Sequence, residues 1–202
     1  MGKALERARV ALDLERWELL RREAAAAIAE DPEESDPYYW LGAAEEALGH
    51  RAEAIRSTRD AIAKDPDWWG YHYSLSKLLL DAGSLPEAAE EAREAVRLRP
   101  DDSSAWGRLS EVLAAQRRGY DAIAAAERGL SLAPNDPDSL NTLAYVLIER
   151  DPGRAEELCR KSLAHDPNQP LVLNNLGGVL QGQDKTEAAA LAFKASMLLD
   201  PS

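Results

Sequence analysis

The sequence is poor in the residues that most often build chemical sites: it has one cysteine and three histidines in 202 residues. Cys159 cannot form an internal disulfide and has no second thiol with which to bind a metal. Its position in the sequence pattern predicts a small buried core residue. His50, His72 and His165 lie far apart, and none has a histidine or cysteine partner at metal-ligand spacing. We therefore expect no metal site and no cofactor.

Long apolar segments are also absent. No run approaches the roughly 20 apolar residues that a membrane-spanning helix needs, so we expect no insertion into a membrane. The N-terminal residues MGKALERARV carry charges where a secretory signal peptide has its apolar segment, which predicts a cytoplasmic protein.

Basic residues are outnumbered by acidic ones, and the formal net charge is −12. A protein that binds phosphate backbones usually presents a basic face. The charge therefore argues against nucleic acid as a partner.

The sequence is rich in internal repetition. Prolines recur at intervals of 34, 34, 34, 33 and 34 residues, namely Pro32, Pro66, Pro100, Pro134, Pro167 and Pro201. They divide the chain into six copies, residues 1–34, 35–68, 69–102, 103–136, 137–169 and 170–202. Three further places recur in phase. Leucine holds place 7 (Leu41, Leu75, Leu109, Leu143, Leu176), a small residue holds place 8 (Gly42, Ser76, Ser110, Ala144, Gly177) and alanine holds place 20 (Ala54, Ala88, Ala122, Ala155, Ala189).

Each copy has the pattern of a helical hairpin, and copy 69–102 is the clearest. Leucines at helical spacing predict a first helix over 70–81, and Ala82-Gly83 predict a break. Ser84, three residues before Glu87, predicts a second helix that begins with reciprocal capping of free N–H groups. Pro100 ends that helix because proline cannot donate to the helical hydrogen bonds. The small residues at places 8 and 20 predict close packing of the two helices.

A helix-turn-helix unit of this length and pattern resembles the tetratricopeptide repeat (TPR). The recurring proline, the Leu-Gly pairs Leu41-Gly42 and Leu176-Gly177, and the alanines are marks of that family. The resemblance covers essentially the whole chain. It implies an all-α fold, a right-handed superhelical solenoid of six hairpins forming one domain over 1–202.

Two copies depart from the pattern. The first copy has Arg7 at place 7 and Leu20 at place 20. Terminal repeats often depart from the pattern in this way. The fifth copy lacks one residue near Asp151-Pro152, which predicts a tighter turn between its helices.

The resemblance also implies a binding surface. In the TPR family the first helix of each copy lines a concave groove, and its places 2, 5, 6, 9, 12 and 13 face the ligand. We refer to these as groove places. In the second to sixth copies they hold Tyr39, Trp40, Tyr73, Ser74, Lys77, Arg108, Glu111, Asn141, Thr142, Tyr145, Asn174 and Asn175.

Aromatic, arginine and asparagine side chains are typical of peptide-binding sites. We expect Lys77 and Arg108 to meet an acidic or carbonyl-rich group, flanked by Tyr73, Asn141 and Tyr145. The alternative for Trp40 and the tyrosines is packing between adjacent helices. Some family members grip a C-terminal carboxylate with a Lys/Asn/Asn/Lys/Arg clamp, but the two asparagines do not precede Lys77 and Arg108 here.

These patterns favour a non-catalytic scaffold that binds an extended peptide or a helix of a protein partner in the groove. An enzyme is disfavoured because the candidate groups are scattered. The alternative is a self-assembling module that binds other copies through its ends or groove. The last copy has Leu191 and Leu198 at places 22 and 29, where the other copies carry mostly charged or small residues. With Met197 and Leu199 they predict an apolar interface patch, covered by a second copy of the chain, by a segment beyond this sequence or by a membrane-proximal partner.

Overall fold

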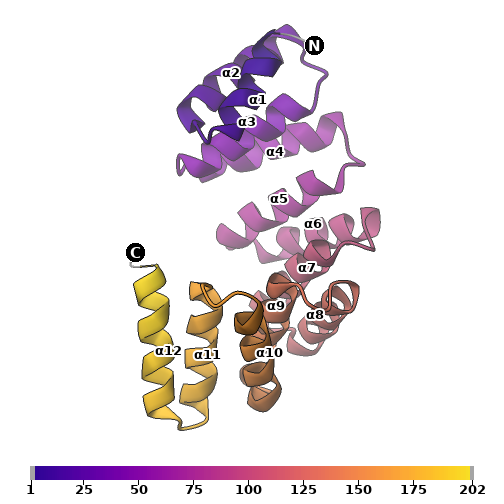
Figure 1. Ribbon diagram of the computed structural model, residues 1–202. Helices are drawn as coiled ribbons and strands as arrows, with labels where there is room; N and C mark the ends of the chain where they lie inside the picture. The colour runs from indigo at the N-terminus through magenta and orange to yellow at the C-terminus, as the bar shows by residue number, and fades with distance from the viewer. Residues whose placement is uncertain (1–2, 201–202) are drawn as a thin grey trace. The chain divides into compact units, whose positions relative to one another are not determined.

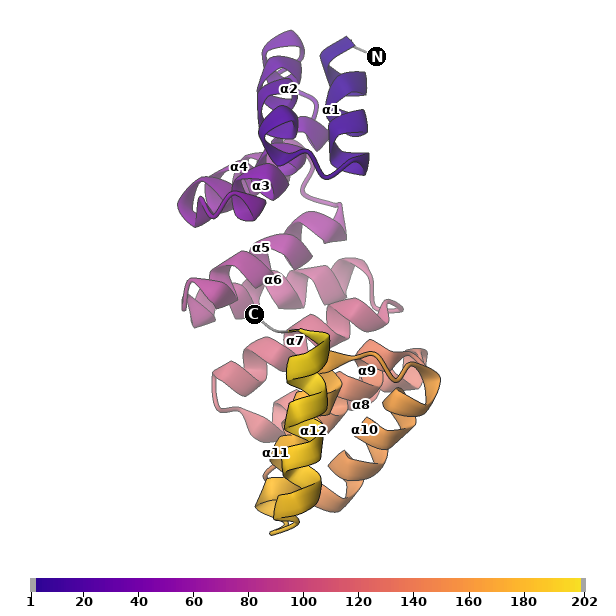
Figure 2. The same cartoon turned by 60° about the vertical axis from the view of Figure 1, so that its left-hand side comes forward.

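The computed structural model describes residues 3–200, which form twelve α-helices and no strand (Figures 1 and 2). The bounds are α1 Lys3–Asp13, α2 Trp17–Glu30, α3 Asp36–Ala47, α4 Arg51–Lys64, α5 Trp69–Asp81, α6 Leu85–Leu98, α7 Ser103–Ala115, α8 Gly119–Leu132, α9 Pro137–Leu147, α10 Pro152–His165, α11 Pro170–Gly182 and α12 Thr186–Leu199. Each predicted copy supplies one hairpin of two helices. The predicted all-α helical repeat solenoid is confirmed.

The helices belong to two compact units, Met1–Arg99 with α1–α6 and Pro100–Ser202 with α7–α12. Within each unit the two helices of a hairpin pack side by side (Figure 1). Within a unit, a second helix also contacts the first helix of the next copy, as α2 contacts α3 and α10 contacts α11. The division of 1–202 into six copies of one continuous domain stays a prediction.

The recurring prolines follow the second helices as expected. The helices α2, α4, α6, α8 and α10 end two residues before Pro32, Pro66, Pro100, Pro134 and Pro167, respectively. Pro201 lies outside the described residues.

The expected capping box at Ser84 is wrong. Ser84 does precede α6, but its side chain makes no capping hydrogen bond. Its backbone, at φ −80° and ψ 61°, lies outside the extended region in which a capping side chain usually reaches the free N–H groups. The residues that do cap are aspartates: Asp102, Asp136 and Asp151 accept hydrogen bonds from the first turns of α7, α9 and α10.

The predicted contact between places 8 and 20 is confirmed. The residues at both places are buried in the second to sixth copies. In two hairpins the contact includes a hydrogen bond. The hydroxyl of Ser76 donates to the carbonyl of Ala88 at 2.9 Å, and that of Ser110 donates to the carbonyl of Ala122 at 2.8 Å.

Place 24 also takes part in this contact. The sequence pattern did not reveal the role of place 24. Where place 8 is serine, place 24 is alanine. Where place 8 is Gly42, the larger Thr58 occupies the space: a Cβ on Gly42 would lie 2.7 Å from Thr58 Oγ1. The Thr58 hydroxyl donates to the carbonyl of Ala54 at 2.8 Å, so it replaces the serine hydroxyl. A Cβ on Gly177 would likewise lie 2.6 Å from the ring of Phe193.

The expected tighter turn in the fifth copy is wrong. The missing residue shortens the first helix: α9 has 11 residues, whereas α5, α7 and α11 have 13. The connection to α10 comprises residues 148–151, one residue more than connection 116–118 in the fourth copy. The other copies have a left-handed residue at place 15, such as Gly49, Gly83 or Arg117, and the fifth has none among its described residues.

Place 20 offers a direct test of the packing. Ala122 is fully buried in the α7–α8 contact, whereas Ala124, two residues further along α8, is exposed. Ala122→Leu should lower the free energy of unfolding by roughly 1–3 kcal/mol through overpacking. Ala124→Leu should change it by less than about 0.5 kcal/mol. Urea unfolding followed by circular dichroism measures both, and equal midpoints for the two variants would contradict the assignment of place 20.

Candidate functional site

Groove-place side chains of neighbouring first helices are joined to one another in the unit Met1–Arg99. The hydroxyl of Ser74 on α5 donates to the hydroxyl of Tyr39 on α3 at 3.3 Å. The ammonium of Lys77 on α5 lies 2.5 Å from the carboxylate of Glu46 on α3. These contacts hold α5 side chains against α3. Lys77 therefore has a carboxylate partner within the protein.

The same pairing of places occurs in the unit Pro100–Ser202. The side-chain amide of Asn175 on α11 donates to that of Asn141 on α9 at 2.8 Å. As with Ser74 and Tyr39, place 6 of one copy bonds to place 5 of the copy before it. Arg108 is paired with Glu111, one turn further along α7.

Exposure differs within the predicted set. Thr142 and Arg108 are partly buried and Asn175 is buried, whereas Lys77, Tyr145 and Asn174 are exposed. The predicted pair of cations lies in different units, with Lys77 in one and Arg108 in the other.

Aromatic groove-place residues pack as well as face solvent. Tyr39 is half-buried in a three-ring cluster, with ring centroids 5.3 Å from Trp68 and 5.2 Å from Tyr71. Tyr73 contacts Trp69 at 5.8 Å in an edge-to-face arrangement. Trp40 packs on the buried cluster that includes Leu20. The alternative that these aromatic side chains pack between helices therefore holds in part for Tyr39, Tyr73 and Trp40.

A hollow of about 480 Å³ lies between α1 and α3, and we call it the α1–α3 hollow. The residues that line it include Leu5, Arg9, Leu12, Asp13, Asp36 and Trp40. The first four hold places 5, 9, 12 and 13 of the first copy, and the last two hold places 2 and 6 of the second. The sequence interpretation missed the contribution of the first copy, although the same places identify it.

A second hollow of about 490 Å³ lies beside the end of α9, and we call it the α9 hollow. The residues that line it include Ala114, Arg117, Tyr145, Ile148, Glu149 and Arg150. Ala114 holds place 12 of the fourth copy, while Tyr145, Ile148 and Glu149 hold places 9, 12 and 13 of the fifth. Groove places thus line a hollow in each unit.

The comparisons with known proteins agree with this pattern. The tetratricopeptide repeat family model matches residues 44–103 and 73–137. The chain belongs to the tetratricopeptide repeat family. The comparison with curated proteins gave no match.

Solved TPR structures share the fold. YrrB, described as a TPR protein with an unusual peptide-binding site, is 18% identical, and the match covers 89% of this chain and 93% of YrrB with a TM-score of 0.61. The pilF protein of Pseudomonas aeruginosa is 19% identical over 98% of this chain and 91% of pilF, with a TM-score of 0.79. A chain of the APC/C hetero-tetramer Cut9–Hcn1 is 16% identical over 99% of this chain and 41% of that one, with a TM-score of 0.85.

Cys159 is buried as predicted, and burial raises the pKa of its thiol to about 11, so it is protonated at neutral pH. Among residues 3–200, no three His, Cys, Asp or Glu side chains are grouped in a way that suits a metal ion. No helix in that range has the length and apolar character to cross a membrane. The cytoplasmic location stays a prediction.

The four apolar side chains of the predicted patch are exposed on α12. Leu191 and Leu198 are 69% and 74% exposed, and Met197 and Leu199 are 70% and 43% exposed. Met197 holds place 28, where Leu130 and Leu163 of earlier copies are partly buried against the next copy. The α12 patch therefore includes a side chain of the kind that a following helix covers elsewhere in the chain.

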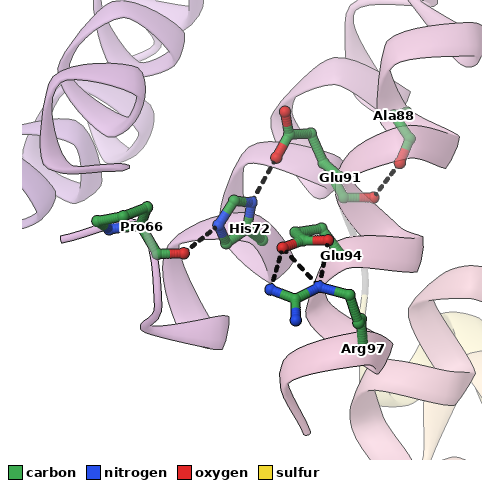
Figure 3. Close-up of polar contacts among 7 residues, drawn as sticks. Pro66, His72, Ala88, Glu91, Glu94 and Arg97 are labelled. Carbon is green, nitrogen blue, oxygen red and sulfur yellow. Dashed lines mark hydrogen bonds and ion pairs between the residues drawn. The ribbon is translucent and has the colours of Figure 1, made fainter. Parts of the chain in front are cut away.

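His72 is the most buried histidine of the described residues, and its ring lies between the carboxylate of Glu91 and the backbone carbonyl of Pro66 (Figure 3). Its Nδ1 lies 2.7 Å from the Glu91 carboxylate, and its Nε2 lies 3.0 Å from the Pro66 carbonyl. A neutral imidazole has one N–H, so only the protonated ring donates to both. Burial opposes protonation, but the hydrogen bonds to Glu91 and Pro66 and the negative charges of Glu91 and Glu94 together outweigh burial and raise the pKa of His72.

A raised pKa in the folded state means that protonated His72 stabilises the fold. That contribution is complete below the unfolded pKa of about 6.5 and is lost as pH rises through the folded value. His72→Gln should therefore lower the free energy of unfolding more at about pH 5.5 than at about pH 9. His165→Gln, at the exposed end of α10, is the control. An equal loss at both pH values for His72→Gln would show that the ring acts only by packing.

Proposed function

We propose that this chain is a non-catalytic scaffold that binds a protein partner, as an extended peptide or a helix, along the groove places of its first helices. The observation that carries the proposal is the composition of the two hollows. Residues at groove places 9, 12 and 13 contribute to the lining of both hollows, and each hollow takes groove-place residues from two neighbouring copies, beside residues at other places.

Fixed side chains favour binding on this surface. The Ser74–Tyr39, Lys77–Glu46 and Asn175–Asn141 contacts hold groove-place side chains before a ligand arrives. Side chains that are already ordered lose less conformational entropy on binding. Lys77 and Arg108 remain part of the proposed surface, and a ligand that reaches them shares or displaces Glu46 and Glu111.

Tyr145 and Asn174 are the groove-place residues best suited to direct contact. Tyr145 is 51% exposed, and Asn174 is exposed with no side-chain hydrogen bond among the described residues. A tyrosine ring offers flat apolar area and an asparagine amide offers both a donor and an acceptor, which together suit an extended backbone. The similarity to YrrB supports the fold. That YrrB is described as having a peptide-binding site supports the proposal only by analogy.

The second candidate function is self-assembly through the α12 patch. Exposed apolar side chains that lie together mark interaction surfaces more often than scattered ones do. Leu191, Met197 and Leu198 are each more than two-thirds exposed on a single helix. This candidate requires the mass of the protein in solution to rise with concentration.

Two double variants separate the candidates. Tyr145→Ala with Asn174→Ala alters the groove places, and Leu191→Glu with Leu198→Glu alters the α12 patch. Peptides selected from a random library on the parent chain serve as the probe, with affinity measured by calorimetry. The first variant should weaken binding about tenfold or more, as expected for interface residues that dominate binding, and the second should leave it unchanged.

Light scattering of the same proteins tests the alternative. If the parent associates and only the Leu191→Glu, Leu198→Glu variant is monomeric, self-assembly through α12 is supported. If the parent is a monomer at all concentrations, that candidate fails. Unchanged peptide affinity in the Tyr145→Ala, Asn174→Ala variant would contradict the groove as the binding surface.

A further inference from the structure

We propose that the α9 hollow is a subsite for a carboxylate, and that the partner peptide places an acidic residue flanked by aliphatic side chains there. This inference rests on the proposed function and names the chemistry that one part of the surface recognises. It differs from the Lys77–Arg108 pair because its two cations are Arg117 and Arg150, which both belong to the unit Pro100–Ser202.

Arg150 is held in a defined position at the edge of the hollow. Its guanidinium carbon lies 4.3 Å from the ring centroid of Tyr120 on α8. A Cβ on Gly119 would lie 2.7 Å from Arg150 Nη2 and 2.8 Å from Nε, so the absence of a side chain at Gly119 leaves room for the guanidinium. A guanidinium that stacks on a ring keeps its N–H donors in the plane, directed away from the ring face. Arg150 is therefore preorganised to accept a planar, bidentate partner.

Arg117 supplies the second cation from the connection between α7 and α8. Within the part of the chain that the structure describes, neither Arg117 nor Arg150 forms an ion pair with a carboxylate. Their neighbour Arg118 does so, because it lies 2.7 Å from Asp121. Glu149 is the acidic residue that lines the hollow. Two arginines beside one glutamate leave the hollow with a positive excess in a chain of net charge −12.

The N-terminus of α8 adds to the positive potential around Arg150. The Arg150 guanidinium lies against Gly119, the first residue of α8, where the helix dipole is positive. Asp121 offsets part of this field but is already paired with Arg118. A carboxylate between Arg117 and Arg150 would be attracted by both cations. Charge-assisted bonds from arginine to carboxylate are among the stronger hydrogen bonds in proteins.

The rest of the hollow determines what the carboxylate is attached to. Ala114, Val146 and Ile148 provide apolar wall, and the half-exposed ring of Tyr145 belongs both to this wall and to the groove places. A peptide that contacts Tyr145 therefore passes the mouth of the hollow. An acidic side chain with an aliphatic neighbour fits this combination, because the apolar wall gains from burial while the arginines bind the charge.

Two matched peptides test the carboxylate directly. The probes are acetyl-Leu-Glu-Leu-amide and acetyl-Leu-Gln-Leu-amide, which differ only in the charged group, and inorganic phosphate alone. The full chain is followed by NMR through the Nε–H signals of Arg117 and Arg150 and the amide signal of Gly119. The glutamate peptide should shift these signals saturably and bind about tenfold more tightly than the glutamine peptide, as expected for a charge-assisted contact.

Arginine variants identify the groups responsible. Arg117→Gln with Arg150→Gln should remove the preference for the glutamate peptide. Arg93→Gln with Arg128→Gln loses the same charge at exposed positions outside the hollow and should retain the preference. Arg150→Lys keeps the charge but loses the planar fork, so it should reduce the preference without reversing it. This single variant guards against misfolding of the double variant, and unchanged preference in both would overturn the subsite.

The remaining outcomes are decisive as well. Equal binding of both peptides would overturn the proposal, because the hollow would then recognise only apolar groups. A shift of the same signals by phosphate at lower concentration than the glutamate peptide would assign the hollow to phosphate and overturn the carboxylate. If the peptide shifts signals of Tyr145 and Asn174 but not of Gly119 or Arg150, the subsite fails while the proposed groove function stands.

Discussion

The close approach of two helices at places 8, 20 and 24 is the constraint on which the second to sixth hairpins depend. An α-carbon with little or no side chain at place 8 allows the alanine at place 20 to reach it, and place 24 supplies the volume that place 8 lacks. Where place 8 is glycine, place 24 is threonine or phenylalanine, and where place 8 is serine, place 24 is alanine. A hydroxyl bonds to the place 20 carbonyl from either helix, as Ser76 and Thr58 do. Hairpins of different composition thus have one contact geometry.

In the proposed function, the other face of each first helix binds the ligand. The core side of the helix is occupied at places 7 and 8, and residues at places 5, 6, 9, 12 and 13 differ from copy to copy. In this chain some of these residues bond to a neighbouring copy and others remain exposed. Ser74–Tyr39 and Asn175–Asn141 join neighbouring copies, and Tyr145 and Asn174 stay exposed. A surface that is partly fixed and partly free suits a scaffold that holds an extended ligand.

Much of the fold could be predicted from the sequence, because its determinants are local and periodic. The prolines after the second helices and the alanines at place 20 repeat in phase, and a repeat limits the possible arrangements. The exceptions depend on geometry that residue types do not fix. Ser84 does not cap α6 because its backbone angles direct the hydroxyl elsewhere. The α9 hollow requires Arg150 to stack on Tyr120 over Gly119, residues that lie 30 and 31 positions away from it in the chain.

A double-mutant cycle on Gly42 and Thr58 tests the central contact most directly. Gly42→Ser alone should crowd the Thr58 hydroxyl, and Thr58→Ala alone should leave a gap, so each should lower the free energy of unfolding by about 1 kcal/mol or more. The double variant recreates the Ser76 and Ala92 pair of the third copy and should be within about 0.5 kcal/mol of the parent. If the two losses instead add in the double variant, places 8 and 24 do not share one space, and the account of the repeat is wrong.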